Sequence, residues 1–110
     1  MAETVRLAQS RPAAATLTAL YAPAASTKFA GQLFICNDTN AGIGARVSIQ
    51  DDGAADAAAQ YIVGGNTNSK AIAANETVVI TGIMLGPTDE LNVYSVTAGL
   101  VFNLVGVDIA

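Results

Sequence analysis

The chain has 110 residues, of which 52% are hydrophobic and 13% charged, and its formal net charge at pH 7 is −4. This length is typical of one domain with its own core, and so apolar a composition excludes a disordered chain. The five basic residues are scattered and form no footprint for nucleic acid. No stretch approaches the ~20 apolar residues of a membrane-spanning helix or the apolar core of a signal peptide. We therefore expect synthesis in the cytoplasm and neither a nucleic-acid nor a membrane partner.

The first segment, residues 1–12, carries mixed polar and charged residues and ends at a proline. This pattern predicts an N-terminal arm that is irregular or poorly paired at a sheet edge. A β-sandwich domain is expected over residues 13–110. Its first strand is predicted at residues 16–21, where threonine, leucine and tyrosine favour extended structure. A helix over the alanine-rich residues 11–22 is the competing prediction.

An apolar run bounded by turn residues predicts the next strand at residues 27–37. Its two faces are Phe29, Leu33 and Ile35 on one side, and Phe34 and Cys36 on the other. Because Cys36 lies within the apolar run LFIC, its expected place is the core, with an exposed reactive thiol as the alternative.

Further strands are predicted at short intervals up to the C-terminus. Alternation of apolar and polar residues predicts one at residues 45–50, and composition predicts others at 60–64 and 76–85. The last two, residues 90–97 and 99–109, are separated by a Thr-Ala-Gly turn and are predicted to form a hairpin. Seven or eight short strands without βαβ alternation are typical of an all-β fold: a single antiparallel β-sandwich, jelly-roll-like or Ig-like.

The residues that usually carry catalysis are scarce. The sequence has no histidine and one cysteine, which excludes imidazole-dependent nucleophiles and the usual structural zinc sites. Asp51, Asp52 and Asp56 form an aspartate-rich segment typical of a solvated turn, since a calcium loop needs more oxygen ligands at alternating spacing. Whether this segment binds calcium stays open. We expect no enzyme activity and no catalytic, cofactor or metal site.

The last strand, GLVFNLVGVDIA, is apolar on both faces. A sandwich covers only one face of each sheet with the other sheet, so the second face of this strand needs another cover. We expect that cover to be another subunit, and coverage by the chain's own N-terminal segment is the alternative. The predicted oligomer interface consists of Val101, Val105, Val107 and Ile109.

Short motifs occur in a fixed order between residues 17 and 109. They are LYAPA (residues 20–24), CN (36–37), ANET (74–77), LNVYS (91–95) and LVFNLVGVDI (100–109). In this order they resemble a group of small structural proteins of tailed-bacteriophage virions, which includes capsid decoration (cement) proteins and tail- or fibre-associated proteins.

The resemblance implies a non-enzymatic virion protein, located at the capsid surface, that self-associates and stabilises the shell of major capsid protein. A trimer is implied because decoration proteins tend to occupy three-fold positions. In this interpretation the N-terminal arm docks on the capsid and offers the guanidinium groups of Arg6 and Arg11 to acidic surfaces. The alternatives are a tail or fibre protein that contacts a host receptor through polar loops, and a small carbohydrate- or calcium-dependent binding module.

Overall fold

The computed structural model describes residues 3–51, 60–65 and 67–110, with Glu3 described by its backbone alone. These residues form nine β-strands and no helix. The strands are β1 (Glu3–Ser10), β2 (Thr18–Tyr21), β3 (Lys28–Asn37), β4 (Ile43–Gln50), β5 (Tyr61–Val63), β6 (Lys70–Ile72), β7 (Thr77–Leu85), β8 (Glu90–Ser95) and β9 (Leu100–Ile109). The predicted all-β class is confirmed, and the alternative of a helix over residues 11–22 is wrong because β2 lies there.

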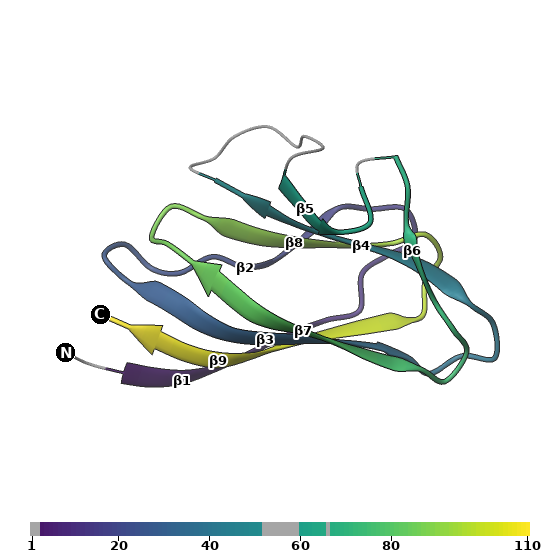
Figure 1. The fold of residues 1–110 in the computed structure, drawn as a ribbon, viewed down its shortest axis with the longest axis horizontal. Helices are drawn as coiled ribbons and strands as arrows, with labels where there is room; N and C mark the ends of the chain where they lie inside the picture. Colours follow the sequence, from purple (N-terminus) through teal and green to yellow (C-terminus); the bar gives the residue numbers. More distant parts are fainter. Residues whose placement is uncertain (1–2, 52–59, 66) are drawn as a thin grey trace.

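The strands form two antiparallel sheets packed against each other (Figure 1). The four-stranded sheet has the order β1-β9-β3-β7, and the five-stranded sheet has the order β2-β8-β4-β5, with β6 also paired to β4. The predicted antiparallel β-sandwich is therefore confirmed. In the described residues it has nine strands, because both the N-terminal segment and the short residues 70–72 are strands.

The order in which the strands pair shows that the sandwich is a jelly roll. β1 pairs with β9, β2 with β8, β3 with β7 and β4 with β5. The chain thus folds back on itself after β4 to form one long antiparallel ribbon of strand pairs. The ribbon is wound so that β1/β9 and β3/β7 lie in one sheet, and β2/β8 and β4/β5 lie in the other. Such winding defines the jelly roll and distinguishes it from the Ig-like alternative. The same topology serves proteins of unrelated function, so the topology alone assigns none.

The predicted hairpin of the last two strands is wrong. β8 pairs with β2 and β4 in the five-stranded sheet, whereas β9 pairs with β1 and β3 in the other sheet. The backbone N–H of Val96 donates to the carbonyl of Gly44 (2.9 Å), which keeps the end of β8 beside β4. The chain then crosses between the sheets at Gly99, whose φ of 134° lies in a region that favours glycine. Both strands still bury alternate apolar residues, but they do so from opposite sides of the core.

The core lies between the sheets and follows the alternation of the strands. On β3 the buried residues are Phe29, Leu33 and Ile35, and on β9 they are Leu100, Phe102 and Leu104. Full burial of each such side chain contributes about 1.5–3 kcal/mol. Cys36, which was expected in the core, is instead partly exposed on the opposite face of β3, because it is out of phase with this alternation.

The crossing from β3 to β4 is held by the buried amide of Asn37. Its Nδ2 donates to the carbonyl oxygens of Ala41 (2.8 Å) and Ile72 (3.0 Å). Its Oδ1 accepts from the backbone N–H of Thr39 (3.0 Å) and from Thr39 Oγ1 (2.6 Å). These four bonds use the full capacity of the amide, so a buried polar group is accommodated where the chain changes sheets.

Candidate interaction surface

The outward side of the four-stranded sheet carries an open row of apolar side chains. We call it the apolar face and define it by Val5, Leu7, Ala30, Phe34, Cys36, Val79, Met84, Val101, Val105, Val107 and Ile109. On β9 these positions alternate with the buried residues, as the period of two in a strand requires. All four residues of the predicted oligomer interface lie on this face.

The register of the strands brings the apolar face together from four separate parts of the sequence. Val107 lies between Val5 of β1 and Ala30 of β3, and Ala30 in turn lies opposite Met84 of β7. The next row places Leu7 beside Val105. Phe34 lies between Asn103 and Val79 in the row after that. The sequence pattern predicted only the contribution of the last strand to this face, because the pairing of β1 with β9 leaves no local signal.

The apolar face is large and exposed. Val5 is 81% exposed, Met84 70% and Leu7 57%. Four strands at ~4.8 Å spacing and nine residues at ~3.4 Å give a face of roughly 19 by 30 Å, or about 600 Å². Lys28, the first residue of β3, is the one charged side chain among those described on this side of the sheet. The polar residues Gln9, Gln32, Asn103 and Thr77 interrupt this face, but its exposed apolar side chains make it the candidate interaction surface.

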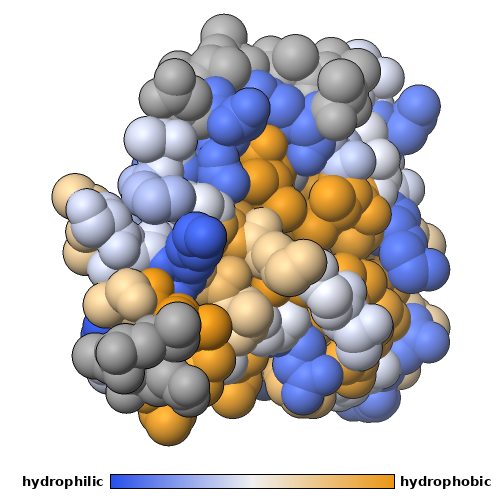
Figure 2. Space-filling view, turned by 60° about the vertical axis from the view of Figure 1, so that its left-hand side comes forward, coloured by the Kyte–Doolittle hydropathy of each residue, from blue (hydrophilic) through white to orange (hydrophobic). Residues whose placement is uncertain are grey.

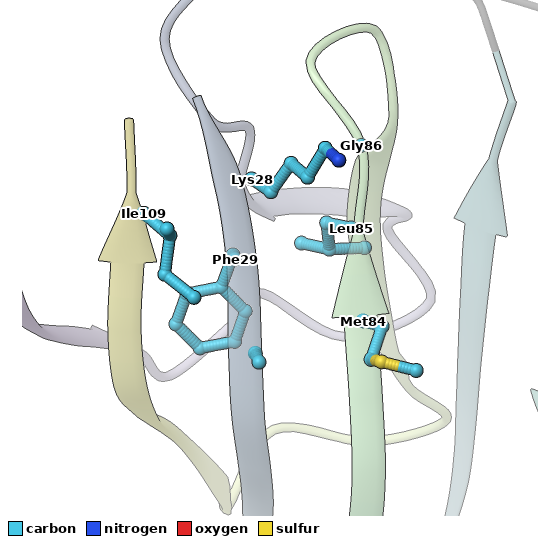
Figure 3. A pocket seen from close by; sticks show the side chains of 7 residues that line it. Lys28, Phe29, Met84, Leu85, Gly86 and Ile109 are labelled. Carbon is cyan, nitrogen blue, oxygen red and sulfur yellow. The ribbon is translucent and has the colours of Figure 1, made fainter. Parts of the chain in front are cut away.

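Hydrophobic side chains also gather at the end of the molecule where β3 begins and β7 and β9 end. Figure 2 looks toward this end and shows hydrophobic residues running from the upper to the lower part of the molecule. A hollow of about 270 Å³ opens here. Figure 3 shows its lining of Lys28, Phe29, Ala30, Met84, Leu85, Gly86 and Ile109. The walls are apolar apart from Lys28, so the hollow suits an apolar side chain of a partner.

A pair of glycines makes room for the ring of Phe29 beside this hollow. Gly31 and Gly106 lie opposite each other on β3 and β9. A Cβ on Gly106 would lie 2.2 Å from the carbonyl oxygen of Ala30 and 2.7 Å from Cζ of Phe29. A Cβ on Gly31 would meet the carbonyl oxygen of Val105 equally closely, at 2.2 Å. No side chain fits at either position, and no local feature of the sequence predicts this constraint.

A buried carboxylate joins the two sheets below the apolar face. Asp108 of β9 accepts hydrogen bonds from Tyr21 Oη, at 2.6 and 2.7 Å to its two oxygens, and from Arg6 Nε at 2.7 Å. The ring of Tyr21 also meets the edge of Phe29, with the ring centroids 5.4 Å apart. The cluster thus connects β1 and β9 of one sheet with β2 of the other.

The pKa values in this cluster follow from its geometry. Burial alone would raise the pKa of Asp108, but the hydrogen bonds from Tyr21 and Arg6, with the charge of Arg6, outweigh it and lower that pKa. Burial, followed by the hydrogen bond to Asp108, raises the pKa of Tyr21. The hydrogen bond to Asp108 likewise raises the pKa of Arg6. The arrangement therefore favours an ionised Asp108, a protonated Tyr21 and a charged Arg6.

The two arginines predicted to dock on a capsid lie in ion pairs within the chain. Arg6 lies on the inward side of β1 with 45% of its side chain exposed, and it contacts Asp108. Arg11 Nη2 lies 3.4 Å from Asp38 Oδ1, and both side chains are more than half exposed. The docking role of Arg6 and Arg11 stays a prediction. Arg6 lies on the edge strand β1, and Arg11 directly follows the end of that strand.

The N-terminal segment does not cover the apolar face. β1 pairs with β9 over every residue from Glu3 to Ser10 and so lies beside it in the same sheet. The alternative in which this segment covers the outward side of the last strand is therefore wrong. β1 instead widens the apolar face by adding Val5 and Leu7.

The outward side of the five-stranded sheet is polar by comparison. The guanidinium carbon of Arg46 lies 4.5 Å from the centroid of the Tyr94 ring, and Arg46 Nε donates to Ser69 Oγ at 2.9 Å. Ser48 and Asn92 are buried and lie opposite each other. Among the described residues, the broad apolar surface therefore lies on the side of the four-stranded sheet.

The aspartate-rich segment lies mostly outside the described residues. Asp51 is exposed after the end of β4, whereas Asp52 and Asp56 belong to the part of the chain that is not described. The calcium prediction for this segment therefore stays untested. Within residues 3–51, 60–65 and 67–110, no three histidine, cysteine or acidic side chains are grouped as metal ligands. The same residues form no helix that is long and apolar enough to span a membrane.

Comparisons with protein-family models, with curated proteins and with solved structures found no match to this chain. The case for a function therefore depends on the apolar face, on the jelly-roll fold and on the motifs along the sequence.

Proposed function

We propose that the chain is a non-enzymatic structural protein of a bacteriophage virion, a capsid decoration protein that self-associates and stabilises the shell of major capsid protein. The observation that carries this proposal is the apolar face. A monomer in water would leave Val5, Leu7 and Met84 more than half exposed on one surface. In an assembled virion, contact with neighbouring proteins would bury this surface.

The size of the apolar face suits a contact that is repeated many times. Complete burial of about 600 Å² of purely apolar surface would contribute about 15 kcal/mol, and the polar Gln32 and Asn103 reduce the contribution of this face. Association costs roughly 4–15 kcal/mol in lost translational and rotational freedom. One face therefore gives a modest net affinity. Hundreds of copies bound to one shell would together add substantially to the stability of that shell.

The jelly roll and the order of the sequence motifs support the same proposal. Jelly rolls occur in viral capsid proteins, although they also occur in lectins and cupins. The apolar face supports the first use, because a sugar- or cofactor-binding site needs convergent polar groups in a pocket. The hollow beside Lys28 has apolar walls and one ammonium group at its rim.

The first test is the number of copies in purified particles of the phage that encodes the chain, measured by quantitative mass spectrometry. We expect hundreds of copies per particle. A few copies would assign the chain to the tail or a fibre, and its absence from the particles would contradict a virion role altogether.

The second test examines the apolar face with a matched pair of variants. Val105, 38% exposed at the centre of the face, is changed to lysine, and Ile62, 44% exposed on β5 of the other sheet, is changed in the same way as the control. Binding is measured on particles that lack the chain. We expect V105K to bind at least about tenfold more weakly, which corresponds to 1.4 kcal/mol, and I62K to bind as the natural chain does. Equal binding by all three chains would contradict a contact through this face.

A further inference from the structure

The two edges of the four-stranded sheet are built differently. At one edge, β7 carries two residues, Thr81 and Gly82, where β3 has one, so the register shifts between Gly31 and Leu33. Gly82 has a φ of 75° at this bulge. Bulges twist an edge away from further pairing, and proteins use them to prevent the addition of a strand.

β1, at the other edge, has no such protection. It pairs with β9 without a register shift over eight residues, and within the described part of the chain no strand of this sheet lies on its other side. From Thr4 to Ser10 it contains no proline or lysine, and its one charged residue, Arg6, is held by Asp108. A long, regular edge with free backbone N–H and C=O groups is a template for another strand.

The exposed side chains of β1 also need a cover. Val5 is the most exposed large hydrophobic residue among those described, at 81%, and Leu7 follows two positions later at 57%. Both project from the apolar face, directly beside the free edge. A strand that pairs with β1 would bring its own side chains against them.

We propose that two copies of the chain pair through their β1 strands, antiparallel and about a two-fold axis, to form one continuous eight-stranded sheet. This inference rests on the proposed self-association and gives it a geometry. The two apolar faces then lie side by side on the same side of the joined sheet and point in the same direction. The self-association uses the β1 edge, which leaves the doubled apolar face available for the shell.

A second copy is the occupant that fits this edge. A two-fold axis presents the same strand from both partners, so the Val5 and Leu7 side chains of the two copies meet across the axis. Their contact also doubles the apolar face from about 600 to about 1,200 Å², which exceeds the ~800 Å² per partner of a standard protein interface. A single copy falls short of that value.

The pairing predicts a dimer, whereas the resemblance to decoration proteins implied a trimer. Light scattering over a concentration series distinguishes the two by mass, since one chain weighs 11.1 kDa. We expect twice the chain mass for the natural chain. Leu7→Lys places two ammonium groups near the axis and should convert the dimer to a monomer, while Ile62→Lys on the other sheet should leave the mass unchanged. Circular dichroism shows that each variant is folded.

Three outcomes would overturn the pairing through β1. They are a mass of three chains, a dimer that is insensitive to Leu7→Lys, and a dimer that is dissociated by Val105→Lys while Leu7→Lys leaves it intact. In all three cases self-association stands and only its geometry fails. A monomer throughout would remove self-association, and the copy number in particles would then decide separately whether the virion role survives.

Disulfide trapping tests the same geometry by position. The natural thiol is removed by Cys36→Ser, and single cysteines are introduced as Val5→Cys or Leu7→Cys, with Ile62→Cys as the control. Antiparallel pairing brings equivalent residues near the axis within the Cα separation of about 4.4–6.8 Å that a disulfide requires. We expect rapid oxidation to a covalent dimer at position 5 or 7 and none at position 62. Equal rates at all three positions would overturn the proposal.

Discussion

Asp108 of β9 and Tyr21 of β2 are joined by hydrogen bonds of 2.6 and 2.7 Å that cross from one sheet of the sandwich to the other. Asp108 is 5% exposed, so its charge depends on Tyr21 and Arg6 in place of water. Because Arg6 belongs to β1, the same carboxylate also ties the edge strand to the body of the protein. The cluster therefore supports both the packing of the two sheets and the position of the free edge.

The first prediction concerns acid. The pKa of Asp108 is lower in the folded protein than its ordinary value of 3.8, so at acid pH the unfolded chain binds more protons than the folded one. The stability contributed by this group is complete above pH 3.8 and is lost as the pH falls through the folded-state pKa. We expect the difference in melting temperature between the natural chain and Asp108→Asn to be constant near neutral pH and to shrink below pH 3.8. A pH-independent difference, measured by circular dichroism, would contradict this role.

Tyr21→Phe isolates the hydrogen bond from the ring. The variant keeps the edge contact with Phe29 but leaves the carboxylate of Asp108 without its phenol donor. Hydrogen bonds to charged groups contribute about 1.5–3 kcal/mol, and we expect a loss of that size in the free energy of unfolding in urea. Tyr94→Phe is the control, since the contact of the ring with Arg46 survives the change. A loss no larger than that of the control would show that Tyr21 acts through its ring alone.

Features that arise within one strand could be predicted from the sequence, whereas features that depend on pairing between distant strands could not. The alternation on β3 and β9 arises within each strand, so the sequence divided each strand correctly into two faces and put Val105 and Val107 on the outside. It did not identify which face of β3 turns inward, and Cys36 was wrongly expected in the core. The jelly roll depends on which strands pair across the chain. Apolar strands on either side of a short turn fit a hairpin and a crossing between sheets equally well, which is why the pairing of β8 with β9 was predicted wrongly.

The same limit applies to the candidate site. Val101, Val105, Val107 and Ile109 could be predicted as an outward face because they share one strand. Val5, Leu7 and Met84 join them only through strand pairing, and no local signal marks that pairing. The burial of Asp108 was equally hidden, because its partners lie 87 and 102 residues away in the sequence.

The glycine pair provides a third prediction. Gly106→Ala places a Cβ 2.2 Å from the carbonyl oxygen of Ala30, and the backbones of β3 and β9 must separate to admit it. Overpacking of this kind costs about 1–3 kcal/mol, and we expect a loss at the upper end because the closest atom belongs to the backbone. In the control, Gly42→Ala, the nearest atom would be 3.6 Å away, an ordinary contact. Equal melting temperatures for the two variants would contradict the close approach.

Asn37→Ala tests the crossing between β3 and β4. The change removes four hydrogen bonds and leaves the buried carbonyl of Ile72 without its side-chain donor. Since one unsatisfied buried group costs about 1–3 kcal/mol, we expect a loss of at least about 2 kcal/mol in the free energy of unfolding. Asn40→Ala, at an exposed position three residues later, should change it by less than about 0.5 kcal/mol. Similar losses at the two positions would show that Asn37 does not hold the crossing.

The last prediction uses the single natural thiol as a probe of the apolar face. Cys36 lies on this face between Val101 and Thr77 and is partly exposed, so an aromatic disulfide reagent should modify it slowly but completely in the free chain. Assembly on particles should slow this reaction at least about tenfold, because a covered thiol cannot be reached by the reagent.

The control for this measurement is Ile62→Cys in a chain whose natural thiol has been removed by Cys36→Ser. Its thiol lies on the other sheet and should react at the same rate in the free chain and on the particle. Protection of both thiols would indicate that assembly buries more than the apolar face, and protection of the position 62 thiol alone would assign the contact to the five-stranded sheet. Because protection of Cys36 alone requires that this side of the sandwich turn inward, it would connect the exposed valines of β9 directly to the assembled particle.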